Sequence, residues 1–146
     1  MGATEMNTSE SNSSASRSVT LAVIDDSAVI RRRLVSMLMQ IKGVKLAGEA
    51  SDAVEGLDLI RAVQPDVVIL DVRMENRSGI GLLEDLKYDS YMPIIIVLTN
   101  YPYVAYRQRC MQLGARYFFD KTTEFPRVAE VVEELASGKD KARESV

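Results

Sequence analysis

The apolar residues of this chain fall into five short runs that alternate with segments of helical periodicity. Each run has the length of a buried strand, and we expect strands at Val19–Ile24, Val44–Ala50, Val67–Leu70, 93–98 and 116–119. Between the runs and after the last one, apolar residues recur every three or four positions. This spacing predicts helices from about 28 to 42, from 52 to 64, over 78–86, over 102–113 and from about 125 to 137.

Residues that favour helix ends flank these segments. Asp52 is suited to cap the second helix, with Glu55 three positions later as its capping-box partner. Gly43, Gly114 and Gly138 follow the first, fourth and fifth helices, where glycine adopts the positive φ that ends a helix. The local signals therefore agree with the periodicity.

Five strands that alternate with five helices predict an α/β fold built from (βα)5. Strands of this kind form a parallel sheet through right-handed crossovers, with helices on both faces. The runs at Val67–Leu70 and 94–97 show no polar alternation, as expected for central strands that are buried on both faces.

The chain is expected to have three parts. Residues 1–17 are rich in Ser, Asn, Thr and Glu and are predicted to be a disordered N-terminal segment. Residues 18–138 carry the alternating pattern and form the single domain, and residues 139–146 form a polar tail.

The composition is that of an ordinary globular protein with 47% apolar residues and a net charge of −3. It predicts neither nucleic-acid binding nor insertion into a membrane. Cys110 is the only cysteine, which excludes an internal disulfide and favours a cytoplasmic location. The chain has no histidine, which excludes Ser-His catalysis and histidine metal ligands, so a bound metal is expected to be a hard, oxygen-bound ion.

Polar residues stand at the ends of four of the predicted strands. Asp25 and Asp26 follow the first, Asp71 follows the third, Thr99 follows the fourth and Lys121 follows the fifth. The carboxyl edge of a parallel sheet is where ligands bind. Each residue taken singly is more simply explained as a helix cap or a solvated side chain. Together they suit a divalent metal and a phosphoryl group held side by side.

These residues have the order and spacing of a known family. Asp25-Asp26-Ser27, the lone Asp71 with Met74 after it, Thr99 behind an apolar strand, and Gly114-Ala115 leading to Phe118 and Lys121 resemble a response regulator receiver domain of two-component signalling. The resemblance runs from about Ser18 to Ser137. It implies a flavodoxin-like, doubly wound sheet of five parallel strands in the order 2-1-3-4-5.

The resemblance also implies a role for each residue. Asp71 would accept a phosphoryl group from a sensor histidine kinase or a histidine phosphotransfer protein, with Lys121 as a counter-charge. Thr99 and Phe118 would form the switch. Mg²⁺ would be held by the side chains of Asp25, Asp26 and Asp71 and by the backbone carbonyl of Arg73. We expect a signalling switch rather than an enzyme, with only self-catalysed phosphorylation and dephosphorylation. No output domain fits after the last helix, so if this sequence is the full protein, we expect it to act by docking when phosphorylated or by passing the phosphoryl group onward.

The sequence departs from the family pattern at three positions. Glu75 and Thr122 stand where many relatives have proline, which leaves the geometry of the Lys121–Thr122 peptide bond open. Arg73 places a cation beside Asp71. We hypothesise that Arg73 screens the acyl phosphate from water and alters its lifetime.

Two further groups have two interpretations each. Tyr103, Tyr106, Cys110 and Leu113 are predicted to form a buried stripe. Alternatively, the tyrosines, including Tyr101, belong to a docking patch for a downstream protein on the face made by the fourth helix, fifth strand and fifth helix. The run 31–33 of three arginines is either a solvated helix face or a contact for the phosphoryl donor.

Three other functions share this architecture. A pseudo-receiver would bind partners without phosphoryl chemistry, but the complete set of site residues argues against it. An aspartyl phosphatase usually has a general acid two residues after its nucleophile, where this chain has Arg73. A flavin carrier would need a phosphate-binding loop where Asp25 and Asp26 stand, and these carboxylates would repel phosphate.

Overall fold

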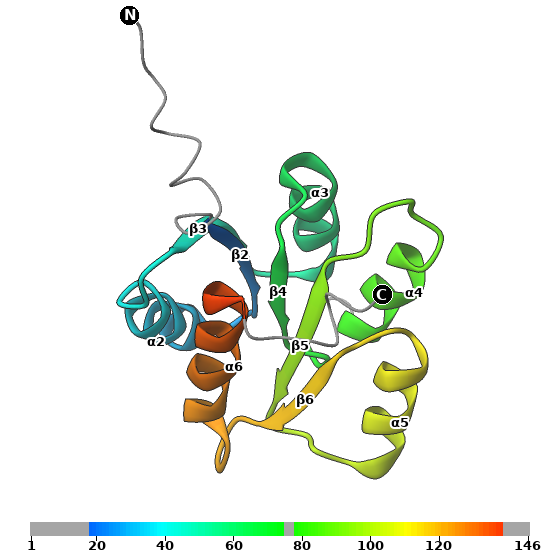
Figure 1. The fold of residues 1–146 in the computed structure, drawn as a ribbon. Helices are drawn as coiled ribbons and strands as arrows, with labels where there is room; N and C mark the ends of the chain where they lie inside the picture. Colours follow the sequence, from blue (N-terminus) through cyan, green and yellow to red (C-terminus); the bar gives the residue numbers. More distant parts are fainter. Residues whose placement is uncertain (1–17, 75–77, 139–146) are drawn as a thin grey trace, which may run out of the picture.

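The computed structural model describes residues 18–74 and 78–138 and shows one sheet covered by helices on both faces (Figure 1). The strands are β2 (Val19–Ile24), β3 (Val44–Ala50), β4 (Val67–Leu70), β5 (Ile94–Thr99) and β6 (Tyr117–Asp120). The helices are α2 (Ala28–Leu38), α3 (Ala53–Val63), α4 (Gly79–Leu86), α5 (Val104–Gln112) and α6 (Phe125–Ser137). The predicted segment 1–17, the tail 139–146 and Glu75 lie outside the described residues.

The sheet has five parallel strands in the order β3-β2-β4-β5-β6. Numbered along the chain, this is the predicted order 2-1-3-4-5, so the doubly wound fold is confirmed. The central strand β4 pairs with β2 through Leu21↔Val67 and with β5 through Val67↔Ile94. All four of its residues are buried, as the absence of polar alternation predicted.

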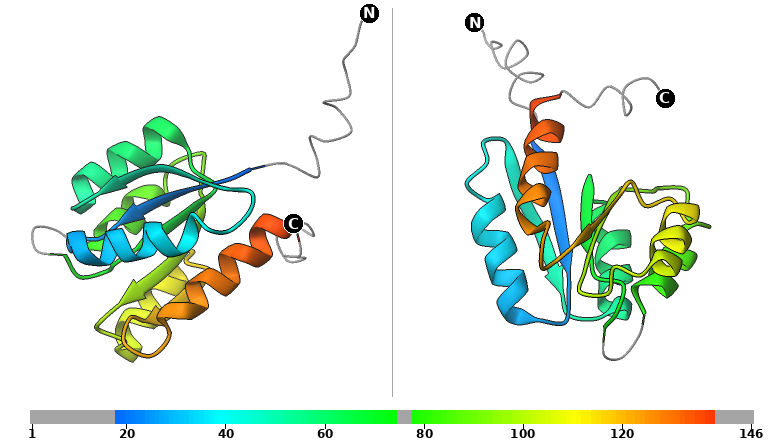
Figure 2. Two further views of the ribbon diagram at one scale, coloured as in Figure 1. Left: turned by 90° about the vertical axis from the view of Figure 1, so that its left-hand side faces the viewer. Right: turned by 90° about the horizontal axis from the view of Figure 1, so that it is seen from below.

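Two hydrophobic clusters lie on opposite faces of the sheet, and alternate residues of each strand enter one or the other. Val67 and Ile69 of β4 pack with residues of α2 and α6, whereas Val68 and Leu70 pack with residues of α3, α4 and α5. Figure 2 shows the same division, with α2 and α6 together on one side of the sheet. Parallel strands need helices on both faces because both faces are apolar.

Three details of the helix ends differ from the prediction. Helix α2 ends at Leu38, so Gly43 serves the turn before β3, where its φ is +85°. Helix α5 starts at Val104 rather than at residue 102. The Asp52 side chain caps the helix by accepting from Glu55 N at 2.8 Å, as predicted. The Glu55 side chain, however, accepts from Ser51 N at 3.1 Å, one residue before the N-cap residue that a capping box would use. None of the described helices has the length and apolar character needed to cross a membrane.

Candidate functional site

The five polar residues singled out by the sequence meet at the carboxyl edge of the sheet. Asp25 and Asp26 follow β2, Asp71 follows β4, Thr99 ends β5 and Lys121 follows β6. These four strands are neighbours in the sheet, so their ends lie in a row. All of these residues except Asp26 are buried.

The ammonium group of Lys121 lies between two buried carboxylates. Its Nζ is 2.6 Å from Asp25 Oδ2 and 2.9 Å from Asp71 Oδ2. The side chains of Lys121, Asp25 and Asp71 are 5%, 3% and 6% exposed. Charge-assisted contacts of this length are strong in a region with little water. Lys121 is therefore the counter-ion that allows both carboxylates to be buried.

Burial is the main reason that the pKa of the Asp71 carboxyl is raised above its ordinary value. The negative charge of Asp25 raises this pKa further, while Lys121 and the N–H of Arg73 oppose the shift. Burial alone would lower the pKa of Lys121, but its hydrogen bonds and charge interactions with Asp25 and Asp71 outweigh burial and raise it. One ammonium group thus leaves the negative charge of the cluster only partly compensated.

The acid cluster has the donors that a hard divalent cation prefers. One carboxylate oxygen from each of Asp25, Asp26 and Asp71 lies within 4.8 Å of the others. Because Asp26 is exposed, the cluster opens to solvent on that side. The partly compensated negative charge and the oxygen-only donor set fit Mg²⁺, which usually takes one or two carboxylates and retains several waters.

The loop after Asp71 is held by its own backbone and by the start of α4. Asp71 Oδ1 accepts a hydrogen bond from Arg73 N at 3.1 Å, and Val72 O accepts one from Gly79 N at 2.9 Å. A Cβ atom on Gly79 would lie 2.3 Å from the backbone oxygen of Asp71, a distance that no side chain tolerates. Glycine at this position therefore permits α4 to pack directly against the loop that carries Asp71.

The two predicted switch residues lie on neighbouring strands. Thr99 is fully buried, and its Oγ1 accepts a hydrogen bond from Tyr101 N at 3.0 Å. Phe118 is buried in the cluster under α3, α4 and α5, and its backbone oxygen accepts a hydrogen bond from Arg107 at 3.2 Å. The aromatic ring therefore points into the core in this structure.

Arg73 is held by aromatic residues. Its guanidinium carbon lies 4.3 Å from the centroid of the Tyr101 ring, and its Nη1 lies 3.5 Å from Tyr106 Oη. This cation–π contact links the loops after β4 and β5. The sequence did not indicate it, since the two residues are far apart in the chain.

The predicted stripe on α5 is partly wrong. Cys110 and Leu113 are buried and Tyr106 is half-buried, but Tyr103 is 56% exposed. Tyr103 precedes the helix as its N-cap, and its ring is tilted against that of Tyr106, with ring centroids 5.5 Å apart. A residue outside the helix does not follow the helical periodicity on which the stripe was based.

The three arginines of residues 31–33 do not share one environment. Arg31 donates to the backbone oxygen of Asp25 at 2.6 Å and contacts Glu49 at 3.2 Å. The guanidinium of Arg33 lies 4.2 Å from the ring centroid of Phe125. The prediction of a solvated face is therefore wrong for Arg31, whose guanidinium is turned to contacts within the protein, whereas Arg32 and Arg33 are exposed as predicted.

The Lys121–Thr122 peptide bond, whose geometry the sequence left open, is trans, because the described residues contain no cis peptide bond.

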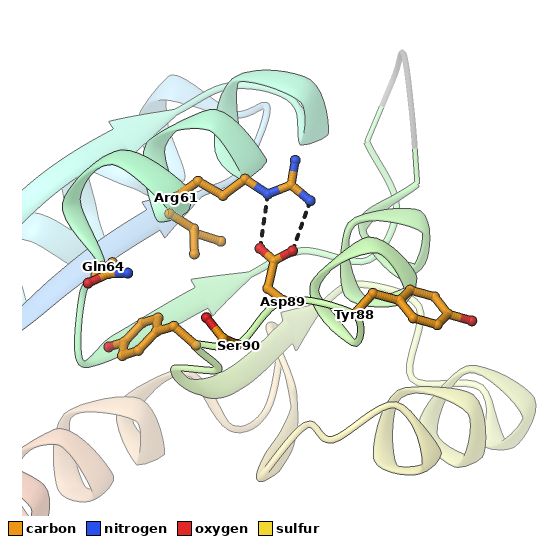
Figure 3. Close-up of a pocket in the computed structure, with 7 residues that line it drawn as sticks. Arg61, Gln64, Tyr88, Asp89 and Ser90 are labelled. Atoms are coloured by element: carbon orange, nitrogen blue, oxygen red, sulfur yellow. Dashed lines mark hydrogen bonds and ion pairs between the residues drawn. The ribbon is translucent and has the colours of Figure 1, made fainter.

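A pocket of about 410 Å³ lies at the opposite edge of the sheet, between the end of α3 and the loop before β5 (Figure 3). Arg61 and Asp89 form a two-pronged ion pair across it, at 2.9 and 3.1 Å. This hydrogen bond lowers the pKa of Asp89 and raises that of Arg61. The pocket lies at the amino ends of the strands, so it is separate from the acid cluster.

Replacing Lys121 removes the cation shared by the two buried carboxylates. We predict that Lys121→Gln lowers the free energy of unfolding by about 3–5 kcal/mol in metal-free buffer, because Asp25 and Asp71 then remain buried without a counter-charge. Urea unfolding measures the loss. Arg109→Gln is the control, since it removes only an exposed pair with Glu84. A loss no larger than the control's would contradict the prediction.

Replacing Asp71 is expected to have the opposite effect. An acid whose pKa is raised on folding stabilises the fold below its unfolded pKa, and this contribution is lost as the pH rises through the folded pKa. We predict that Asp71→Asn raises the free energy of unfolding at neutral pH without metal. The gain should disappear below the ordinary pKa of an aspartate, about 3.9. Urea unfolding across this pH range tests the prediction, and an Asn variant less stable than the parent at neutral pH refutes it.

Comparison with known proteins gives a consistent result. The model of the response regulator receiver domain family matches residues 21–133. An uncharacterised response regulatory protein of Vibrio cholerae is 35% identical over 116 residues, which cover 77% of this chain and 46% of that protein. A protein-glutamate methylesterase/protein-glutamine glutaminase of Caulobacter vibrioides is 32% identical over 130 residues, covering 88% of this chain and 38% of the enzyme. The chain therefore spans less than half the length of both relatives.

Solved structures agree with the sequence matches. The receiver domain of the response regulator NarL from Mycobacterium tuberculosis has a TM-score of 0.75 at 27% identity, covering 84% of this chain and 98% of that one. The response regulator domain of Thermotoga maritima CheB has a TM-score of 0.73 at 25% identity, covering 82% and 94%. Because the family model spans most of the sheet and both structures share the fold, the chain belongs to the response regulator receiver domain family.

Proposed function

We propose that Asp71 accepts a phosphoryl group from the phosphohistidine of a sensor histidine kinase or a histidine phosphotransfer protein. Membership of the receiver family supports a phosphoryl-accepting signalling role. The observation that carries the assignment to Asp71 is its position, buried at the end of the central strand and 2.9 Å from the Lys121 ammonium. The printed sequence has no histidine, so the phosphohistidine has to lie outside it.

In the proposed reaction, a carboxylate oxygen of Asp71 attacks the phosphorus of the donor. The new P–O bond forms as the P–N bond of the phosphohistidine breaks, and the imidazole leaves with the electron pair of that bond. Lys121 then has a new anion within its reach and pairs with a phosphoryl oxygen. The chain contributes mainly position and positive charge, as is usual for phosphoryl transfer.

Asp25, Asp26, Asp71 and the backbone carbonyl of Arg73 are the groups proposed to hold Mg²⁺. When bound, the ion supplies the positive charge that offsets repulsion between the carboxylate and the incoming phosphoryl group. The hydrogen bond from Arg73 N to Asp71 Oδ1 supports this set, because it fixes the Arg73 backbone beside the carboxylate.

Thr99 and Phe118 are the residues proposed to transmit the phosphorylated state. Thr99 lies on the strand between those that carry Asp71 and Lys121, and Phe118 lies on the next strand. The output is either a conformational switch read by a downstream protein, for which the α5-β6-α6 face is the proposed docking surface, or onward transfer of the phosphoryl group. We place the protein in the cytoplasm and regard this receiver domain as a signalling switch rather than an enzyme.

Intact mass measurement tests the acceptor directly. After incubation with Mg²⁺ and a small acyl phosphate, we predict a gain of one phosphoryl group, lost in Asp71→Asn and when the metal is chelated. Asp58→Asn, at an exposed position on α3, is the control and should be phosphorylated normally. No gain with any donor, a kinase included, would instead favour a binding-only pseudo-receiver.

The contact between Arg73 and Tyr101 leads to a prediction about the phosphorylated form. Their stacked side chains join the loops on either side of the proposed phosphoryl site, which supports the hypothesis that Arg73 screens it from water. We predict that Arg73→Ala and Tyr101→Leu both shorten the lifetime of the acyl phosphate, measured as its loss over time after donor removal. Arg109→Ala is the control for charge. Rates equal to the parent in both variants would remove the hypothesis.

A further inference from the structure

The backbone of Asp25 is held by a side chain from the neighbouring helix. Arg31 donates from Nη1 to Asp25 O at 2.6 Å and from Nε to Glu49 Oε1 at 3.2 Å. The Arg31 side chain is only 19% exposed, although it lies in a run of three arginines on a surface helix. Its guanidinium is therefore committed to contacts within the protein.

Local geometry explains why Arg31 reaches this carbonyl. Arg31 lies in the first turn of α2, where its N–H donates to Ser27 O at 3.0 Å. Helical side chains lean toward the helix N-terminus, and the N-terminus of α2 follows directly after β2. Glu49 lies opposite Val23 in the pairing of β3 with β2, which places its carboxylate near the same strand end.

The hydrogen bond to Asp25 O restrains the orientation of a whole peptide unit. The carbonyl of Asp25 and the N–H of Asp26 belong to one plane, so fixing the oxygen also fixes the direction in which the chain continues. Asp25 is held at three further atoms, by Ala50 O at 3.1 Å, by Ser27 N at 2.9 Å and by Lys121 Nζ at 2.6 Å. The Asp26 side chain leaves the backbone directly after this peptide, so the orientation of the peptide affects where its carboxylate lies.

Glu49 makes the arrangement compatible with a nearby cation. An arginine beside a metal site would ordinarily repel the metal, but the Glu49 carboxylate neutralises the guanidinium at 3.2 Å. The pair thus supplies a hydrogen-bond donor to the backbone with little net positive charge.

We infer that Arg31 is a positioning residue for the Mg²⁺ site, acting by orienting the Asp25–Asp26 peptide so that the Asp26 carboxylate faces Asp71. The inference rests on the proposed function, since it assumes that the acid cluster binds Mg²⁺. This role for Arg31 differs from both interpretations of residues 31–33 made from the sequence, a solvated helix face and a contact for the phosphoryl donor.

The test uses the full chain and Mg²⁺ alone as the probe, with affinity measured by calorimetry. We expect Arg31→Gln to weaken Mg²⁺ binding roughly 10-fold or more, the usual effect of losing a group that orients a metal ligand. Arg31→Lys should recover part of the loss, because lysine donates to the carbonyl but cannot contact Glu49 at the same time. Arg32→Gln, at the exposed neighbour, should bind as the parent does.

Salt dependence separates positioning from simple charge. Glu49→Gln leaves the guanidinium without its neutralising partner, so any weakening of Mg²⁺ binding should shrink at high ionic strength. The loss in Arg31→Gln should persist at high salt, because it arises from geometry. In nitrogen-15 spectra without metal, the Asp26 amide should shift in Arg31→Gln and not in Arg32→Gln.

The outcomes are distinct. If the parent binds Mg²⁺ and Asp26→Asn does not, while folded Arg31→Gln binds as the parent does, this inference is overturned and the proposed function stands. If Arg31→Gln does not fold, Arg31→Met decides, because methionine keeps much of the side-chain length but has no donor, and parent-like affinity together with an unshifted Asp26 amide overturns the inference. If the parent itself does not bind Mg²⁺, the metal part of the proposed function fails and the role of Arg31 fails with it.

Discussion

The site depends on one buried ammonium group that is shared by two carboxylates. Lys121 and Asp71 are 50 positions apart in the chain, and the sheet brings them into contact. Adjacent strands lie about 4.8 Å apart, so β6 is about 10 Å from β4, and only a long side chain spans that gap. Thr99 ends the intervening strand β5, so the Lys121 side chain reaches across the end of that strand to Asp71. An exchange of strand order would separate these groups and leave buried charges unpaired.

The features that the sequence predicted well are those that depend on burial over a whole element. Strands such as Val67–Leu70 are apolar at every position because helices cover both faces of the sheet. This pattern does not depend on how individual side chains pack. The five polar residues were also predictable, because the ends of parallel strands share one edge. Helix ends were less so. Gly43 has a positive φ, as expected, but a turn before a strand requires this conformation as much as a helix end does.

The roles of surface side chains could not be predicted because they depend on neighbours from distant segments. The run of residues 31–33 looks uniform in sequence, yet Arg31 contacts β2 and β3 whereas Arg33 lies over Phe125 of α6. Tyr103 shares its spacing with a buried stripe but stands just before the helix begins. In both cases the environment of the side chain depends on where a helix starts or on what packs beside it. The local sequence does not determine either.

One hydrogen bond of Thr99 joins the end of β5 to the segment that follows it. Its Oγ1 accepts the amide proton of Tyr101, and this bond anchors the segment that leads into α5. Threonine is β-branched, so its hydroxyl moves by discrete rotamer jumps rather than by small adjustments. A jump toward the Asp71 side would deprive the Tyr101 amide of its acceptor and free the aromatic segment beyond it. In its observed rotamer, the hydroxyl of this one residue tethers the entrance of α5 to the end of β5.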